Sequence, residues 1–146
     1  MRVAIGSDHG GYELKEKIKS YLNSQNVSVV DYGTNSSDPV DYPDFGEKVG
    51  HAITQGDFDF GIVLCGTGIG ISIAANKVKG VRAALVYDDT TARLAKEHNN
   101  ANIIALGGRT TTYEKAISII NTFSQATYEK RHQKRLDKIK NIEGKE

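Results

Sequence analysis

The sequence has 146 residues, of which 38% are hydrophobic and 25% are charged, and its formal net charge is +1. These values are typical of one soluble globular domain and exclude a disordered chain, and the near-neutral charge argues against a general nucleic-acid or membrane surface. The single cysteine excludes an internal disulfide.

The first elements begin at the amino terminus. Residues 1–6 run straight into a strand pattern, without a long apolar leader or a stretch near the length of a membrane span, so we expect a cytoplasmic protein. The strand at residues 3–6 is followed by a glycine-containing turn and an amphipathic helix at about residues 12–22. Asp8 and His9 therefore lie at the mouth of this helix, where Asp8 could equally serve as a helix cap.

A second strand, a polar loop and a second helix follow. The strand is expected at residues 27–32, the loop at residues 33–43, and the helix from Pro43 to about Gln55, because proline suits the first turn of a helix. Tyr42 precedes that proline. It either packs the loop or contacts a ligand, and the sequence leaves both interpretations open.

The most informative stretch is FGIVLCGTGIGISIAANK at residues 60–77. Its continuous apolar run indicates a strand of a parallel sheet covered on both faces, which places Cys65 at the carboxyl end of that strand. The alternating glycines allow a sharp turn, and the following helix would aim its free N–H groups at a bound anion. The loop is not a dinucleotide fingerprint, because the third glycine of that pattern would fall on Ile71, and it lacks the lysine of a nucleotide P-loop.

Cys65 has two interpretations. A free cysteine is most often a buried, inert residue. A thiol at the start of a helix, however, is favoured as the nucleophilic and basic thiolate. Its position at the end of a strand, beside the glycine loop, favours the functional interpretation.

The remaining elements continue the alternation. We expect a strand at residues 81–87, a helix at 88–97, a strand at 103–106 that ends in Gly107-Gly108-Arg109, and a helix at 111–126. This pattern predicts an α/β fold with a doubly wound, Rossmann-like five-stranded parallel sheet and helices on both faces. With a strand order of 2-1-3-4-5, the ligand site would lie between the first and third strands, where Asp8 and His9 face the Cys65 loop.

The chain ends in a polar segment, EKRHQKRLDKIKN at residues 129–141, which predicts a helix too polar for a core. Arg131 and Arg135 are four residues apart and share a face, which is either a solvated surface or a phosphate contact. We expect a single domain over residues 1–146, with a C-terminal helix and tail at about 127–146. No internal repeat or linker is present.

Together, several motifs resemble ribose-5-phosphate isomerases of the B type, in the ribose/galactose isomerase family. They are GSDHGG, DYPDF, CGTGIGISIAANK, HNNAN, GGR and YEKRHQKR, in that order, and the resemblance spans the chain from Ala4 to Ile139. It implies an aldose-ketose isomerase that interconverts ribose 5-phosphate and ribulose 5-phosphate, in the non-oxidative branch of the pentose phosphate pathway, through a cis-enediolate and without metal or organic cofactor. It also implies a homodimer, or a tetramer, in which each site is built from two subunits.

The resemblance assigns roles to individual residues. Cys65 would be the base, with Thr67 beside it, and His98 would protonate and open the furanose ring. Some relatives use a glutamate in the following helix turn, but Ile71 and Ser72 fill that region here, which leaves Cys65 as the only candidate. The candidate substrate-binding residues are Asp8, His9, Tyr42, Gly66, Gly68, Ile69, Gly70, Asn99, Arg109, Arg131 and Arg135. Of these, His9 and the three arginines would hold the phosphate.

Elementary chemistry supports the same assignment. Removal of a proton beside a carbonyl needs a base and a preorganised oxyanion site in one place, which the cysteine and the glycine loop would supply. Ring opening needs a group that titrates near neutrality, as histidine does, and a distant phosphate provides binding energy that fixes the geometry. The histidines and the cysteine show no paired metal-ligand spacing, so we expect no metal.

Three other functions stay open. The same machinery could act on a 6-phosphohexose such as allose 6-phosphate or galactose 6-phosphate, although the galactose enzyme resembles a pair of diverged subunits rather than one chain. A nucleotide-binding or nucleic-acid-binding module could use the glycine loop and the basic tail, with Asp88 in place of the ribose-binding acid. A silent sugar-phosphate sensor is the third. We expect no nucleic-acid or membrane partner.

Overall fold

The structure, a computed structural model, describes residues 1–145. Its strands are β1 (Arg2–Ser7), β2 (Ser28–Asp31), β3 (Phe60–Cys65), β4 (Ala83–Leu85) and β5 (Ile103–Gly107). Its α-helices are α1 (Tyr12–Ser24), α2 (Tyr42–Gln55), α3 (Ile69–Ala75), α4 (Asp89–Glu97), α5 (Tyr113–Gln125) and α6 (Gln133–Gly144), and η1 (His9–Gly11) and η2 (Lys130–His132) are 3₁₀ turns. Each predicted strand and helix is present.

All five strands pair in parallel, in the order β2-β1-β3-β5-β4. The predicted fold class is confirmed, but the expected order of the last two strands, 2-1-3-4-5, is wrong. β5 is buried at every position and pairs with β3 from Gly61 to Cys65, whereas β4 has three residues and leaves Leu85 38% exposed. A short, partly exposed strand suits the edge of a sheet. The predicted ligand site between β1 and β3 is unaffected, because these two strands are neighbours in either order.

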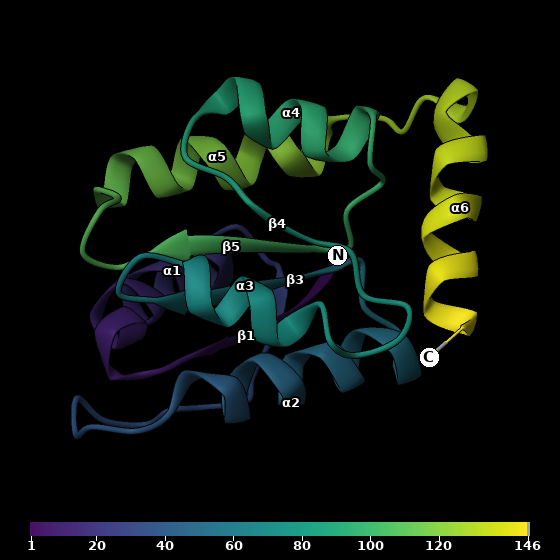
Figure 1. The fold of residues 1–146 in the computed structure, drawn as a ribbon. Coiled ribbons are helices and arrows are strands. Elements are labelled where there is room, and N and C mark those ends of the chain that lie inside the picture. The colour runs from purple at the N-terminus through teal and green to yellow at the C-terminus, as the bar shows by residue number, and fades with distance from the viewer. Residues whose placement is uncertain (146) are drawn as a thin grey trace.

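The helices cover the sheet on both faces (Figure 1). Successive side chains of a strand point to opposite faces, so in β3 Ile62 and Leu64 pack with α1, α4 and α5, while Val63 and Cys65 pack with α2 and α3. Because apolar side chains occupy both faces of β3, the strand reads as a continuous apolar run. Cys65 is thus held in the smaller core, at the last position of the central strand.

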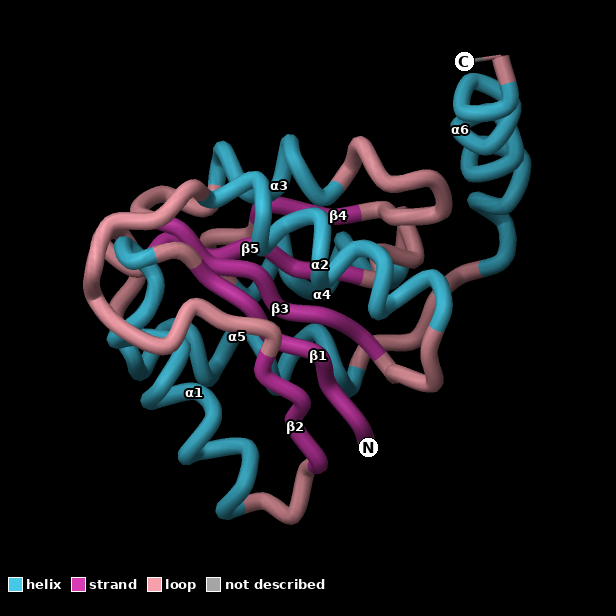
Figure 2. Tube along the Cα trace, turned by 90° about the horizontal axis from the view of Figure 1, so that it is seen from below, coloured by secondary structure: helices cyan, strands magenta, loops and turns pink. Residues whose placement is uncertain are grey.

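The terminal segment is displaced from the sheet. The last helix was expected from Glu129, but residues 130–132 form the turn η2 and α6 begins at Gln133. The helix stands apart from the layered body (Figure 2), and Leu136 is its one buried residue within the described part of the chain. The prediction that this helix is too polar for the core is confirmed. No helix in residues 1–145 is long and apolar enough to cross a membrane.

Candidate active site

The carboxyl ends of β1, β3 and β5 bring three loops together at one end of the strands, which we call the carboxyl edge of the sheet. The backbone N–H of Asp8 donates to the Leu64 carbonyl at 3.1 Å, and that of Gly108 donates to the Cys65 carbonyl at 2.8 Å. The N–H of Arg109 donates to the Gly66 carbonyl at 2.9 Å. These hydrogen bonds fix the loops after β1 and β5 on either side of the glycine loop that follows β3.

The glycine loop folds around the thiol. The backbone N–H of Gly68 donates to Cys65 Sγ at 3.2 Å, and the thiol is buried, with 5% of Cys65 exposed. Gly68 adopts a left-handed conformation, with φ at 80°, and this turn starts α3. Thr67 Oγ1 accepts from the Ile69 N–H at 3.2 Å. A thiol and amide donors therefore occupy one place at the strand end, and a base together with such donors is the combination that proton abstraction beside a carbonyl needs.

The Asp8-His9 turn lies directly beside this loop. Asp8 Oδ1 accepts from the N–H groups of Gly10 and Gly11, at 2.8 and 3.2 Å, so the capping role foreseen for Asp8 is present. His9 Nδ1 accepts from the Val40 N–H at 3.1 Å, which fixes the ring and leaves Nε2 as its donor. With Nδ1 accepting from Val40, His9 offers the N–H of Nε2 to a ligand.

Tyr42 and Arg109 also reach the glycine loop. A ring carbon of Tyr42 lies 2.6 Å from the position that a Cβ on Gly70 would occupy, and Arg109 Nη1 lies 3.0 Å from that position on Gly66. Tyr42 is 41% exposed. The tyrosine therefore packs on the loop and still presents surface beside it, so both interpretations of this residue persist.

His98 and Asn99 lie at the other end of the strands, which we call the amino edge of the sheet. His98 ends α4, and Arg82 Nε donates to the Asn99 carbonyl at 3.2 Å near the amino end of β4. Because β3 has six residues and a strand rises about 3.3 Å per residue, the two edges are roughly 15–20 Å apart. Within one chain, His98 and Asn99 do not meet Cys65.

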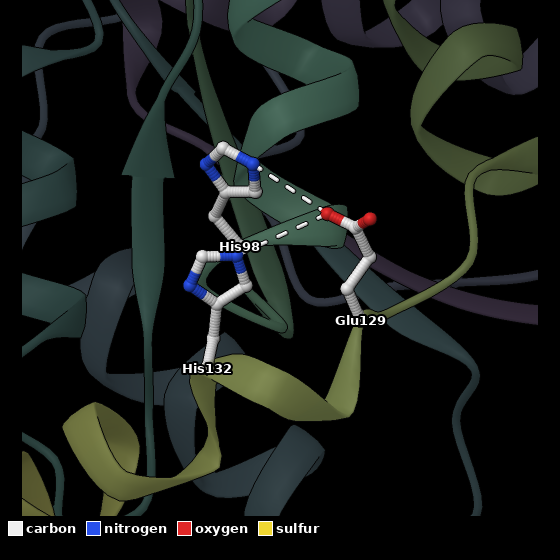
Figure 3. Close-up of side chains that lie close together, drawn as sticks. All are labelled: His98, Glu129 and His132. Atoms are coloured by element: carbon white, nitrogen blue, oxygen red, sulfur yellow. Dashed lines mark ion pairs between the residues drawn. The ribbon is translucent and has the colours of Figure 1, made fainter.

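The basic tail joins His98 rather than Cys65. The Glu129 N–H donates to the Glu97 carbonyl at 2.9 Å, which brings η2 against the end of α4. Figure 3 shows Glu129 Oε1 facing both imidazoles, 3.6 Å from His98 Nε2 and 3.9 Å from His132 Nε2. Arg131 Nη2 lies 3.3 Å from the same carboxylate oxygen, and Arg135 Nη1 lies 3.3 Å from His132 Nδ1.

The predicted site residues therefore form two groups. Those at the carboxyl edge are Asp8, His9, Tyr42, Cys65, Gly66, Thr67, Gly68, Ile69, Gly70 and Arg109. Those at the amino edge are His98, Asn99, Arg131 and Arg135. One chain thus holds the thiol with its glycine loop, and separately a histidine with two cationic side chains.

Sequence reasoning missed Glu129 and His132, although both stand in the segment YEKRHQKR. Their ligand atoms and that of His98 lie within 4.8 Å of one another, so the fold creates a trio that linear spacing from His98 did not indicate. The available signal was the separation of three residues between Glu129 and His132, which places two polar side chains one helical turn apart.

Comparison with known proteins identifies the family. The family model described as Ribose/Galactose Isomerase matches residues 3–139. The chain belongs to the ribose/galactose isomerase family. A solved ribose-5-phosphate isomerase B of Clostridium thermocellum is 50% identical over 99% of both chains, with a TM-score of 0.97.

Two curated members of the family bear different names. Ribose-5-phosphate isomerase B of Escherichia coli is 43% identical over 143 residues, covering 97% of this chain and 96% of that protein. The galactose-6-phosphate isomerase subunit LacB of Clostridium acetobutylicum is 48% identical over 128 residues, covering 88% of this chain and 74% of that protein. The resemblance stated from the motifs is confirmed at the level of the family.

Proposed function

We propose that this family member interconverts D-ribose 5-phosphate and D-ribulose 5-phosphate, and that Cys65 is the base. The observation that carries the proposal is the thiol at the end of β3 with a loop amide donating to its sulfur at 3.2 Å. The near-complete match to a ribose-5-phosphate isomerase B, with a TM-score of 0.97, supports the choice of substrate. The expected place of the reaction is the non-oxidative pentose phosphate pathway, in the cytoplasm.

In the isomerisation step, the Cys65 thiolate takes the proton from C2 of the open-chain aldose. The electrons of the C–H bond form the C1–C2 double bond, and the carbonyl oxygen becomes the enediolate oxygen. The amides of residues 66–70 hold this negative charge. A proton then moves from O2 to O1, and return of the proton from the thiol to C1 leaves O2 as the carbonyl oxygen of the ketose, so the overall step is neutral in protons and needs no redox cofactor or metal.

Ring opening and phosphate binding need the second group of residues. His98 gives a proton to the ring oxygen as its bond to C1 breaks, and the proton released from the C1 hydroxyl returns to the imidazole through solvent. His9 and Arg109 would bind the phosphate from the carboxyl edge, and Arg131 and Arg135 from the amino edge. Asp8, Asn99 and Tyr42 are the further proposed sugar contacts.

These groups can meet if two copies of the chain associate. Beside the glycine loop, exposed apolar side chains occupy α3 and the edge strand: Ile69 is 51% exposed, Ile73 56% and Leu85 38%. Leu85 Cδ1 lies 2.8 Å from the position of a Cβ on Gly68, so this apolar surface adjoins the loop. A homodimer over this surface would bring the projecting tail of one copy to Cys65 of the other, with two sites per dimer, and a tetramer would pair such dimers.

A 6-phosphohexose is the competing substrate, and the 48% identity to the galactose-6-phosphate isomerase subunit is the observation in its favour. The nucleotide-binding alternative is weaker, because Asp88 Oδ1 accepts from the Thr91 N–H at 2.7 Å, and this helix cap accounts for the acid. It therefore need not bind a ribose.

A direct assay tests the proposal. Purified protein is incubated with ribose 5-phosphate, allose 6-phosphate or galactose 6-phosphate in the presence of a chelator, and the ketose phosphate is measured. We expect the highest kcat/KM with ribose 5-phosphate, unchanged by chelation. A preference for a hexose phosphate would reassign the substrate, and binding of sugar phosphates without turnover would indicate a sensor.

A further inference from the structure

The trio of Glu129, His132 and His98 is assembled within one chain and is separate from the cysteine loop. The imidazole rings of His98 and His132 pack against each other in a tilted arrangement, with centroids 4.3 Å apart and planes inclined by 36°. Their Nε2 atoms both face the Glu129 carboxylate (Figure 3). His98 is 37% exposed at its side chain, whereas His132 is 10% exposed. One ring is thus available to a ligand, and the other is packed behind it.

The hydrogen bonds of His132 fix which of its nitrogens carries the proton. Arg135 can only donate, so the contact of 3.3 Å from Arg135 Nη1 makes His132 Nδ1 an acceptor. Burial, followed by the nearby charges of Arg131, His98 and Arg135, lowers the pKa of His132, which favours the neutral ring. A neutral ring with an accepting Nδ1 carries its proton on Nε2.

This tautomer leaves a buried N–H donor unpaired within the described part of the chain. His132 Nε2 is buried and has no hydrogen-bond partner among residues 1–145. Its N–H faces Glu129 Oε1 at 3.9 Å, outside hydrogen-bond range, and His98 Nε2 lies 3.6 Å from the same oxygen. Both contacts are thus longer than a hydrogen bond in this structure. Catalytic hydrogen bonds are often long in the absence of substrate and tighten when it binds.

A metal ion is the other group that three such ligand atoms, within 4.8 Å of one another, could hold. Two permanent cations argue against it, because Arg131 lies 3.3 Å from the carboxylate and Arg135 lies 3.3 Å from the buried imidazole. Like charges this close repel a dication strongly in a partly buried site. The surroundings instead suit a single carboxylate that interacts with two imidazoles.

We propose that Glu129 and His132 are positioning residues for His98, holding its imidazole in the orientation from which it opens the sugar ring. The inference rests on the proposed function, since it gives His98 the ring-opening role. Glu129 faces the positive charge that His98 carries while it holds the proton, and His132 supports one face of the ring and orients Glu129 through its Nε2 proton. The unit is complete within one chain, so it would reach the site of a partner copy preassembled.

The test combines a mutant cycle with an isotope effect. Turnover of ribose 5-phosphate, and of the same sugar deuterated at C2, is measured for wild type, Glu129→Gln, His98→Ala and the double variant. Cys65→Ser serves as a reference in which proton transfer limits the rate. The matched control is Glu47→Gln, which breaks another exposed carboxylate–histidine pair, with His51 at 3.4 Å, whose members belong to neither group of site residues.

We expect Glu129→Gln to lower kcat/KM about tenfold to a hundredfold, which is part of the contribution of a general acid. In the His98→Ala background, the same substitution should cause almost no further loss of kcat/KM. We expect its isotope effect to be close to one, since ring opening would limit the rate, whereas Cys65→Ser shows a full primary effect. Glu47→Gln should match wild type.

Several results would overturn the proposal. One is an isotope effect in Glu129→Gln as large as that in Cys65→Ser. Another is that Glu129→Gln lowers kcat/KM by the same factor in the His98→Ala background as in wild type. A third is a raised KM with unchanged kcat in Glu129→Gln, which would mean that Glu129 only orients Arg131. Loss of wild-type activity on chelation, restored by one divalent ion, would assign the trio to a metal instead. A wild-type protein without turnover would instead refute the proposed function itself.

Discussion

Cys65 is the residue on which the proposed chemistry depends. Its side chain lies in the apolar cluster beneath α2 and α3, and its sulfur accepts the Gly68 N–H. We predict that Cys65→Ala abolishes turnover while lowering the free energy of unfolding by only about 1–2 kcal/mol, as for other small buried truncations. Activity assays, circular dichroism and urea unfolding measure the two effects. Wild-type turnover in this variant would show that another group is the base.

A second residue-scale feature, unforeseen from the sequence, is a buried ion pair. Lys15 is fully buried, and its Nζ lies 2.5 Å from Asp31 Oδ2, which Lys19 Nζ also approaches at 2.6 Å. Burial raises the pKa of Asp31, but the hydrogen bonds from the two lysines and Gly33 outweigh burial, so the net shift is downward. The carboxylate therefore stabilises the fold above its unfolded pKa, and this contribution is lost as pH falls through the lowered value.

We predict that Asp31→Asn destabilises the protein by about 3–5 kcal/mol at pH 7, because it leaves the charge of Lys15 buried without its main partner. The difference between the two proteins should shrink as pH falls below about 4, where the Asp31 carboxyl of the unfolded wild-type chain becomes protonated, and further through the lowered pKa of the folded protein. Urea unfolding at both pH values measures this. Asp38→Asn, at an exposed position, is the control. A difference that stays constant down to pH 2 would contradict the ion-pair account.

At the scale of elements, the glycine loop needs one left-handed residue. A Cβ on Gly68 would lie 2.8 Å from Leu85 Cδ1 and 2.9 Å from the Leu106 carbonyl carbon, in addition to the strain of a φ of 80°. Gly80 has a similar φ of 90°, but a Cβ there would meet only the Thr54 side chain, at 3.2 Å. An alanine would therefore be strained at either position, but only at Gly68 would its Cβ also clash with backbone atoms.

We predict that Gly68→Ala displaces the loop and reduces kcat at least tenfold, whereas Gly80→Ala keeps kcat. Both variants should lose about 1–2 kcal/mol of stability from the left-handed backbone, and Gly68→Ala should lose more. Steady-state kinetics and thermal unfolding of the pair provide the measurement. Equal kcat values for both variants would mean that the loop conformation does not position the chemistry.

The sequence predicted the elements well because their signals are local. Apolar periodicity located all five strands, and the proline after Tyr42 marked the start of α2 to within a residue. The strand order needed long-range information, since residues 81–87 and 103–106 are both apolar runs and local pattern does not say which pairs with β3. Likewise, the contacts of Glu129 with His98 and of Lys15 with Asp31 join residues far apart in the chain.

At the scale of the whole molecule, the proposed homodimer would give the exposed apolar surface a role. Ile73 is 56% exposed on α3, beside the glycine loop, and would be buried between two copies. We predict that Ile73→Glu yields a folded monomer with turnover reduced at least a hundredfold, because each Cys65 then lacks a partner's His98. Sedimentation and activity measure this, with Lys17→Glu on the exposed side of α1 as the control. A fully active monomer would contradict the shared site.

Complementation tests the central claim most directly, namely that the Cys65 of one copy works with the basic tail of another. Cys65→Ala and Arg135→Ala homodimers should each be nearly inactive. When the two are unfolded and refolded together, half of the dimers are mixed, and each mixed dimer has one site with both defects and one intact site. About a quarter of wild-type activity should return, by two-fold symmetry. A mixture that stays as inactive as its parents, while mixed dimers are shown to form, would place the arginine and Cys65 in the same chain's site.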